Sequence, residues 1–291
     1  MLQLVLGAVM ISFSAVFVKL VHVPPTVSGF YRVFFGGLIL LGVMLFRRES
    51  LATLKPRAIL VLCLAALFFA LDLFFWHRSI LYVGPGVATL LANFQVFVLA
   101  AVGVLFLHER LTIPQWLAIL LAMAGLVLLV GADWSHLPPL YHRGVILALI
   151  SAVCYAGYLL ALRSSRSSGT GGSSYAAITV VSLATAAMLA LSMLAEGASF
   201  DIPSWTDGFW LVLYGLVPQV LGWVMISNSM SKVGASQVGL VLLLQPACAF
   251  IWDGVFFGRR FTAVELTGAA ITLVAIYLGT LRATRRTKES S

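Results

Sequence analysis

Apolar runs of about 20 residues, separated by short clusters of charged or turn residues, follow one another along the whole chain. An α-helix needs a run of this length to cross the hydrocarbon core of a bilayer. The pattern predicts ten transmembrane helices, near residues 2–21, 28–46, 58–81, 86–107, 113–131, 144–162, 175–195, 208–231, 235–257 and 263–281. The alternation typical of a lipid-facing β-barrel is not visible, so we expect an all-α integral membrane protein.

The second half of the chain repeats the first at an offset of 150 residues. Polar and glycine positions keep this register, because Val83-Gly84 returns as Val233-Gly234 and Gln95 returns as Gln245. Each half holds five apolar runs, and an odd number turns the second copy upside down in the membrane. The sequence therefore predicts ten transmembrane helices arranged as two inverted five-helix repeats.

The predicted repeats cover residues 1–140 and 141–281, and a basic cytoplasmic tail follows at 282–291. In transporters built from inverted repeats, the substrate site lies near the midplane of the bilayer, between the two repeats. Candidate site residues are therefore the polar and aromatic side chains in the middle of the predicted spans.

Composition and charge agree with a chain surrounded by the lipid bilayer. Only 10% of the residues are charged and the mean hydropathy is +1.05, whereas about a quarter of the residues of a soluble domain are charged. Twelve of the 18 lysines and arginines fall on one side if the N-terminus is cytoplasmic, which predicts that both termini are cytoplasmic. Arg259 and Arg260 go against this rule. The basic residues are scattered over short connectors, so we expect no nucleic-acid partner.

Two stretches resemble a known family. Gly84-Pro85-Gly86-Val87-Ala88 opens a span that His108-Glu109-Arg110-Leu111-Thr112 closes, and the second copy has Val233-Gly234-Ala235-Ser236 followed by Gln245-Pro246. This pattern is similar to the EamA-type repeat of the drug/metabolite transporter superfamily. The run from Ala88 to Gln95 resembles bacterial amino-acid exporters within it, in particular those for aromatic amino acids.

This resemblance implies a secondary transporter that exports aromatic and other neutral amino acids, or related small metabolites, by alternating access. It also implies a multi-pass location in the bacterial inner membrane, a small-molecule substrate and no cofactor, and we expect a monomer. Proton coupling stays open. The alternatives are a multidrug or other metabolite carrier of the same fold and, more distantly, an intramembrane enzyme. The sequence has no hydrolase, zinc-protease or nucleotide-binding motif, so it predicts no catalytic residue and no metal site.

Ionisable residues inside a predicted span are costly and call for a partner or a role. Asp72 lies past the middle of the third span, where it could bind the amino group of a substrate or a proton. The alternative is a structural carboxylate paired with Lys19 or with amides of the fourth span. His77 beside Trp76 could form a gate near the outer mouth, while Lys19 and Arg32 read as interfacial anchors.

Amides and aromatic rings supply the other candidates. Asn93 and Gln95 lie mid-span but about 200° apart around the helix, so they cannot both face one cavity. Alternatively, amides of this kind only form hydrogen bonds that hold neighbouring helices together. The predicted substrate-binding residues are Asp72, Trp76, His77, Asn93, Gln95, Phe97, Tyr155, Tyr158 and Gln245, and the predicted hinge or gating residues are Gly84, Gly86, Pro218 and Pro246.

Overall fold

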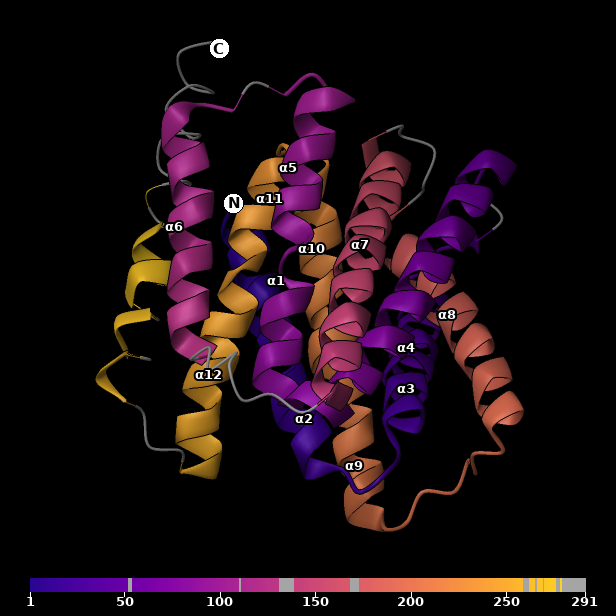
Figure 1. Cartoon of the computed structure of the whole chain (residues 1–291). Coiled ribbons are helices and arrows are strands. Elements are labelled where there is room, and N and C mark those ends of the chain that lie inside the picture. Colours follow the sequence, from indigo (N-terminus) through magenta and orange to yellow (C-terminus); the bar gives the residue numbers. More distant parts are fainter. Residues whose placement is uncertain are drawn as a thin grey trace.

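The computed structural model describes residues 1–51, 54–109, 111–130, 139–167, 173–258, 262–264, 266–268, 270–275 and 278. Every regular element in these ranges is a helix (Figure 1). The first half contains α1 (Leu2–Ser12), α2 (Ser14–Leu20), α3 (Pro25–Phe46), α4 (Pro56–Ala92), α5 (Gln95–Leu105) and α6 (Ile113–Val130). The second half contains α7 (Pro139–Ser167), α8 (Ser174–Glu196), α9 (Trp205–Tyr214), the π-helix η3 (Gly215–Gly222), α10 (Trp223–Met230), α11 (Ala235–Leu242) and α12 (Leu244–Phe257).

Helices of membrane-spanning length account for most of the described chain. Seven stretches are long and apolar enough to cross a bilayer: Leu2–Leu20, Pro25–Phe46, Pro56–Val83, Leu140–Arg166, Ser174–Glu196, Trp205–Met230 and Gln237–Phe257. Three shorter apolar helices, Gln95–Leu105, Ile113–Gly125 and Leu266–Ala275, accompany them. The all-α membrane class predicted from the sequence is therefore confirmed, while the arrangement as ten spans in two inverted repeats stays a prediction.

Helices from the two halves of the chain interleave. Helix α4 of the first half packs along α7 of the second, and α3 packs along α8. Helix α1 lies against η3, α10 and α12, which also belong to the second half. Figure 1 shows α4 and α7 side by side near the middle of the bundle, with α8 on one flank and α6 on the other. The space enclosed by this packing is consequently lined by residues from both halves.

Three of the helical runs are interrupted in mid-course. The chain breaks at Phe13 between α1 and α2, at Asn93-Phe94 between α4 and α5, and at Leu243 between α11 and α12. At each break a backbone N–H bonds to the carbonyl three residues earlier, as from Phe13 to Met10. The spans predicted near 2–21, 86–107 and 235–257 each contain one of these breaks.

Two of these breaks follow the internal repeat, because Leu243 stands 150 positions after Asn93. Another difference concerns residues 82–85, which the sequence predicts as a turn between two spans and which lie inside α4. A helix hydrogen-bonds its backbone N–H and C=O groups within its own segment. In apolar surroundings this favours a continuous helix through residues 82–85 over a turn.

Close contacts between backbones hold the first helix against the second half. A Cβ added to Gly7 would lie 2.7 Å from Cγ1 of Ile226 and 2.8 Å from the carbonyl oxygen of Gly222. Only glycine permits this approach, and glycine at helix contacts is typical of membrane bundles.

We predict that Gly7→Ala destabilises the protein. The added methyl group has to displace the Gly222 backbone, and overpacking of this kind costs about 1–3 kcal/mol. Thermal unfolding of the detergent-solubilised protein measures the effect. Gly42→Ala is the matched control, because nothing lies within 4 Å of its added Cβ and alanine favours a helix over glycine. Equal melting temperatures for the two variants would contradict the proposed contact.

Candidate functional site

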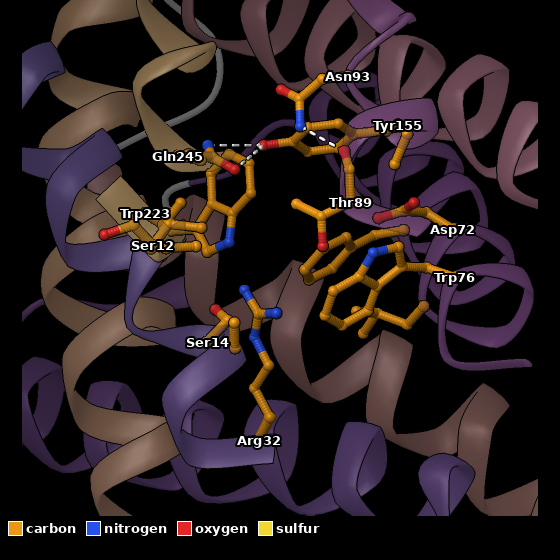
Figure 2. A pocket seen from close by; sticks show the side chains of 16 residues that line it. Ser12, Ser14, Arg32, Asp72, Trp76, Thr89, Asn93, Tyr155, Trp223 and Gln245 are labelled. Atoms are coloured by element: carbon orange, nitrogen blue, oxygen red, sulfur yellow. Dashed lines mark hydrogen bonds between the residues drawn. The ribbon is translucent and has the colours of Figure 1, made fainter. Parts of the chain in front are cut away.

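A cavity of about 70 Å³ lies between the helices, with charged and polar side chains set into a largely apolar wall. Its wall comes from α1, α2, α3, α4, α7, α10 and α12, which belong to both halves of the chain. Phe69 is one of its aromatic residues, and Figure 2 labels the other polar and aromatic lining residues, which are Ser12, Ser14, Arg32, Asp72, Trp76, Thr89, Asn93, Tyr155, Trp223 and Gln245.

All three helix breaks lie at this cavity. Ser12 and Ser14 flank the break at Phe13, Asn93 follows the end of α4, and Gln245 is the second residue of α12. Irregular backbone is tolerated at membrane depth where it lines a cavity, and broken helices of this kind form the substrate sites of secondary transporters. The cavity is therefore the candidate binding site.

Asp72 contributes a buried carboxylate to the wall. Its exposed fraction is 7%, and the hydroxyl of Ser151 on α7 donates a hydrogen bond of 2.5 Å to its Oδ1. The expected structural partners, Lys19 or amides of the fourth span, do not bond to it in the described part of the chain. A carboxylate is acceptor-only when ionised and can take several hydrogen bonds, so Asp72 retains acceptor capacity toward a ligand.

Arg32 was missed as a site residue, and its assignment as an interfacial anchor is wrong. The residue is 4% exposed and lies seven positions, or about 10 Å, inside α3, too deep for its head group to act simply as an anchor at the helix end. Nε donates to Oε1 of Gln219 at 3.2 Å, and Nη1 donates to the hydroxyl of Tyr214 at 3.4 Å. The guanidinium also lies 5.6 Å from the ring centroid of Phe69. Its depth within an apolar segment was the signal that could have identified it.

The three candidate amides have different surroundings. Asn93 lines the cavity and donates to the carbonyl of Thr89 at 2.7 Å. Gln245 also lines it, and its Nε2 donates to the hydroxyl of Tyr155 at 3.1 Å. Gln95 does not line it, and both of its amide atoms are buried without a hydrogen-bond partner in the described part of the molecule. The spacing argument that separated Asn93 from Gln95 therefore agrees with their placement.

The candidate rings divide between the cavity wall and its surroundings. Trp76 and Tyr155 line the cavity, whereas Tyr158 is fully buried with its ring stacked 4.4 Å from that of Phe69. His77 and Phe97 are not among the described residues that line the cavity. Nδ1 of His77 lies 2.7 Å from the carbonyl oxygen of Leu73 in its own helix, and Phe97 packs against a second apolar cluster.

The candidate hinge residues lie at irregular or glycine-rich points of helices. Pro218 is inside the π-helix η3, and Pro246 is in the first turn of α12, directly after the break at Leu243. Proline has no N–H to donate to the carbonyl four residues earlier, that of Leu242, which fits the break at Leu243. Gly84 and Gly86 lie within α4, and their side-chain surroundings fall outside the described part of the structure.

Polar contacts tie helices together near both ends of the bundle. At one end, Oε1 of Glu109 accepts from the backbone N–H of Ala235 at 2.7 Å and lies 3.6 Å from Nη2 of Arg163. At the other end, Arg78 pairs with Glu196 at the end of α8. Figure 1 shows that the ends of α5 and α8 carrying these contacts lie at opposite ends of the molecule. Each end of the bundle therefore carries a polar contact between helices.

A helical membrane bundle with a central polar cavity and broken helices in its wall is typical of secondary transporters. The EamA-like transporter family matches residues 1–131 and 142–281, and the chain belongs to this family. It is therefore a membrane transporter and not an enzyme, as the sequence predicted.

Relatives of known sequence and structure agree with this assignment. The chain is 26% identical to an uncharacterized transporter of Archaeoglobus fulgidus over 277 residues, which cover 94% of each chain. It is 25% identical to the pseudopaline exporter CntI of Pseudomonas aeruginosa over 249 residues, 84% of this chain and 82% of that one. A solved crystal structure superposes with a TM-score of 0.82 at 21% identity, covering 98% of this chain and 97% of that one, which supports the fold alone.

Tyr155 and Tyr158 allow the same substitution to be compared with and without a hydrogen bond to the hydroxyl. Tyr155→Phe removes the hydrogen bond to Gln245 and leaves that amide unsatisfied, so we expect the free energy of unfolding to fall by about 1 kcal/mol. Tyr158→Phe removes a buried hydroxyl that has no partner among the described residues, so stability should be unchanged or higher. Thermal unfolding in detergent compares the two variants, and a larger loss for Tyr158→Phe would contradict the described hydrogen bonds.

Proposed function

We propose that this protein exports amino acids, aromatic and other neutral ones, or related small metabolites across the bacterial cytoplasmic membrane by alternating access. The observation that carries the proposal is the buried carboxylate of Asp72 in a cavity formed by both halves of the chain. A buried carboxylate that keeps free acceptor sites suits the ammonium group of an amino acid. We propose that those predicted substrate-binding residues that line the cavity contact the substrate.

The walls of the cavity support an apolar side chain on the substrate. Trp76, Tyr155 and Trp223 present rings to it, and Phe69 adds a fourth. Aromatic walls with a few fixed polar groups are typical of small-molecule sites.

Alternating access is supported by the contacts at the two ends of the bundle. Opening toward one surface requires release of the Glu109 contacts to Arg163 and Ala235, and opening toward the other requires release of the Arg78–Glu196 pair. We infer that the two five-helix repeats, 1–140 and 141–281, rock against each other. Gly84, Gly86, Pro218 and Pro246 are the proposed points of flexion, and both termini are proposed to be cytoplasmic.

Export of another metabolite is the second candidate. The likeness to a protein named as a pseudopaline exporter favours it, because the cargo in that name is not one of the proposed amino acids. Both candidates use the same cavity and the same mechanism, so the identity of the cargo separates them.

Uptake into proteoliposomes tests the proposal directly. We expect saturable uptake of radiolabelled phenylalanine, threonine or methionine by liposomes containing the purified protein, and unlabelled amino acids should compete. Empty liposomes are the control. Absence of uptake of all three amino acids by folded protein would reject the amino-acid candidate in favour of another metabolite.

Asp72→Asn tests the proposed role of the carboxylate. The amide keeps the shape but lacks the charge, and hydrogen bonds to charged groups contribute about 1.5–3 kcal/mol, so binding should weaken roughly tenfold to a hundredfold. Competition assays at several pH values measure both affinity and proton dependence. If Asp72 carries a coupling proton, the variant loses the pH dependence of transport, and unchanged pH dependence would exclude that role.

A further inference from the structure

The groups in direct contact with Arg32 are neutral. Its hydrogen bonds go to Gln219 and Tyr214, and its face contacts the rings of Phe69 and Tyr214. Asp72 lines the same cavity, but no direct ion pair joins Arg32 to it or to another acid among the described residues. A buried guanidinium without a direct ion pair is costly in a membrane interior, so its retention points to a ligand that supplies the paired charge.

The guanidinium is also oriented toward the cavity. Its hydrogen bonds use Nε and Nη1 and leave Nη2 without a partner among the described residues. Figure 2 shows the head group pointing from α3 into the space between Ser14 and Trp76. Because guanidinium presents its donors as a rigid fork, the edge that remains suits a carboxylate.

Gln219 holds this orientation. Its Oε1 accepts from Arg32, and its Nε2 donates to the hydroxyl of Ser182 at 2.9 Å, so the amide is fixed at both of its atoms. Gln219 is fully buried and lies in the π-helix η3, and π-helical segments occur frequently at functional sites. Gln219 is thus a positioning residue for Arg32.

Two opposite charges therefore line one small cavity without neutralising each other directly. Asp72 has a hydrogen bond from Ser151, and among the described residues neither Asp72 nor Arg32 forms a direct ion pair. A ligand with a carboxylate at one point and an ammonium group at another would satisfy both.

We propose that Arg32 binds the carboxylate of the substrate while Asp72 binds its ammonium group, so that the site selects zwitterions of the α-amino-acid class. This inference rests on the proposed function and specifies which of its substrates the cavity accepts. An amine without a carboxylate leaves Arg32 unpaired, and an acid without an ammonium group leaves Asp72 unpaired. The aromatic walls then select among zwitterions by side chain.

Competition in proteoliposomes tests this proposal with the amino acid that the protein transports. The probes are that amino acid, its primary amide, which lacks the negative charge, and its N-acetyl derivative, which lacks the positive charge. For the unmodified protein we expect each derivative to compete at least tenfold more weakly than the amino acid. A derivative that competes as well as the amino acid would overturn the proposal.

Variants test which residue binds the carboxylate and which binds the ammonium group. In Arg32→Gln the amide should compete as well as the amino acid, while discrimination against the N-acetyl derivative remains. Asp72→Asn should show the reverse, and Arg32→Lys should retain part of the preference for the carboxylate. Arg57→Gln, an exposed arginine at the start of α4, is the matched control and should behave as the unmodified protein. An equal loss of affinity for the amino acid and the amide in Arg32→Gln would also overturn the proposal.

Failure of this inference differs from failure of the proposed function. If the unmodified protein transports amino acids but does not distinguish the derivatives, the function stands and the charge pairing is wrong. If it transports no amino acid, the proposed cargo is wrong. If Arg32→Gln does not fold, as judged by thermal unfolding in detergent, the derivative series on the unmodified protein decides alone.

Discussion

The structure depends on one constraint, which is that polar groups inside a bilayer have to find their partners within the protein. For the backbone this means helices, because each helix satisfies its own N–H and C=O groups. The chain departs from regular helix at Phe13, Asn93-Phe94, Leu243 and η3, and each departure lies at or beside the central cavity. Irregular backbone and the candidate site consequently coincide.

The same constraint applies to side chains with charge. Asp72 and Arg32 are buried in an apolar bundle, where each would be expensive alone. Neutral donors, acceptors and rings reduce this cost through Ser151, Gln219 and Tyr214 without cancelling either charge. A direct ion pair would be more stable without ligand but would compete with a substrate. The observed separation therefore suits reversible binding.

The membrane class, the internal repeat and part of the candidate site could be predicted from the sequence. Hydropathy identified the membrane class, the register of Gln95 and Gln245 revealed the repeat, and burial cost singled out Asp72. Arg32 was taken for an anchor because the predicted span began at residue 28, whereas α3 begins at Pro25 and places Arg32 deeper in the helix. Ser151 could not be identified either, because burying a serine in a membrane helix costs little free energy and so marks no particular position. Only the packing of α3 against η3, and of α4 against α7, brings these residues to the cavity.

Gln95 and Gln245 occupy equivalent positions of the repeat but have different surroundings. Gln245 faces the cavity and bonds to Tyr155, whereas Gln95 is buried with both amide atoms unpartnered among the described residues. The two glutamines are therefore equivalent in sequence but not in contacts, because the helices packed around each position differ. A match in the sequence repeat identifies a pair of positions, and only the packing decides which of the two reaches the cavity.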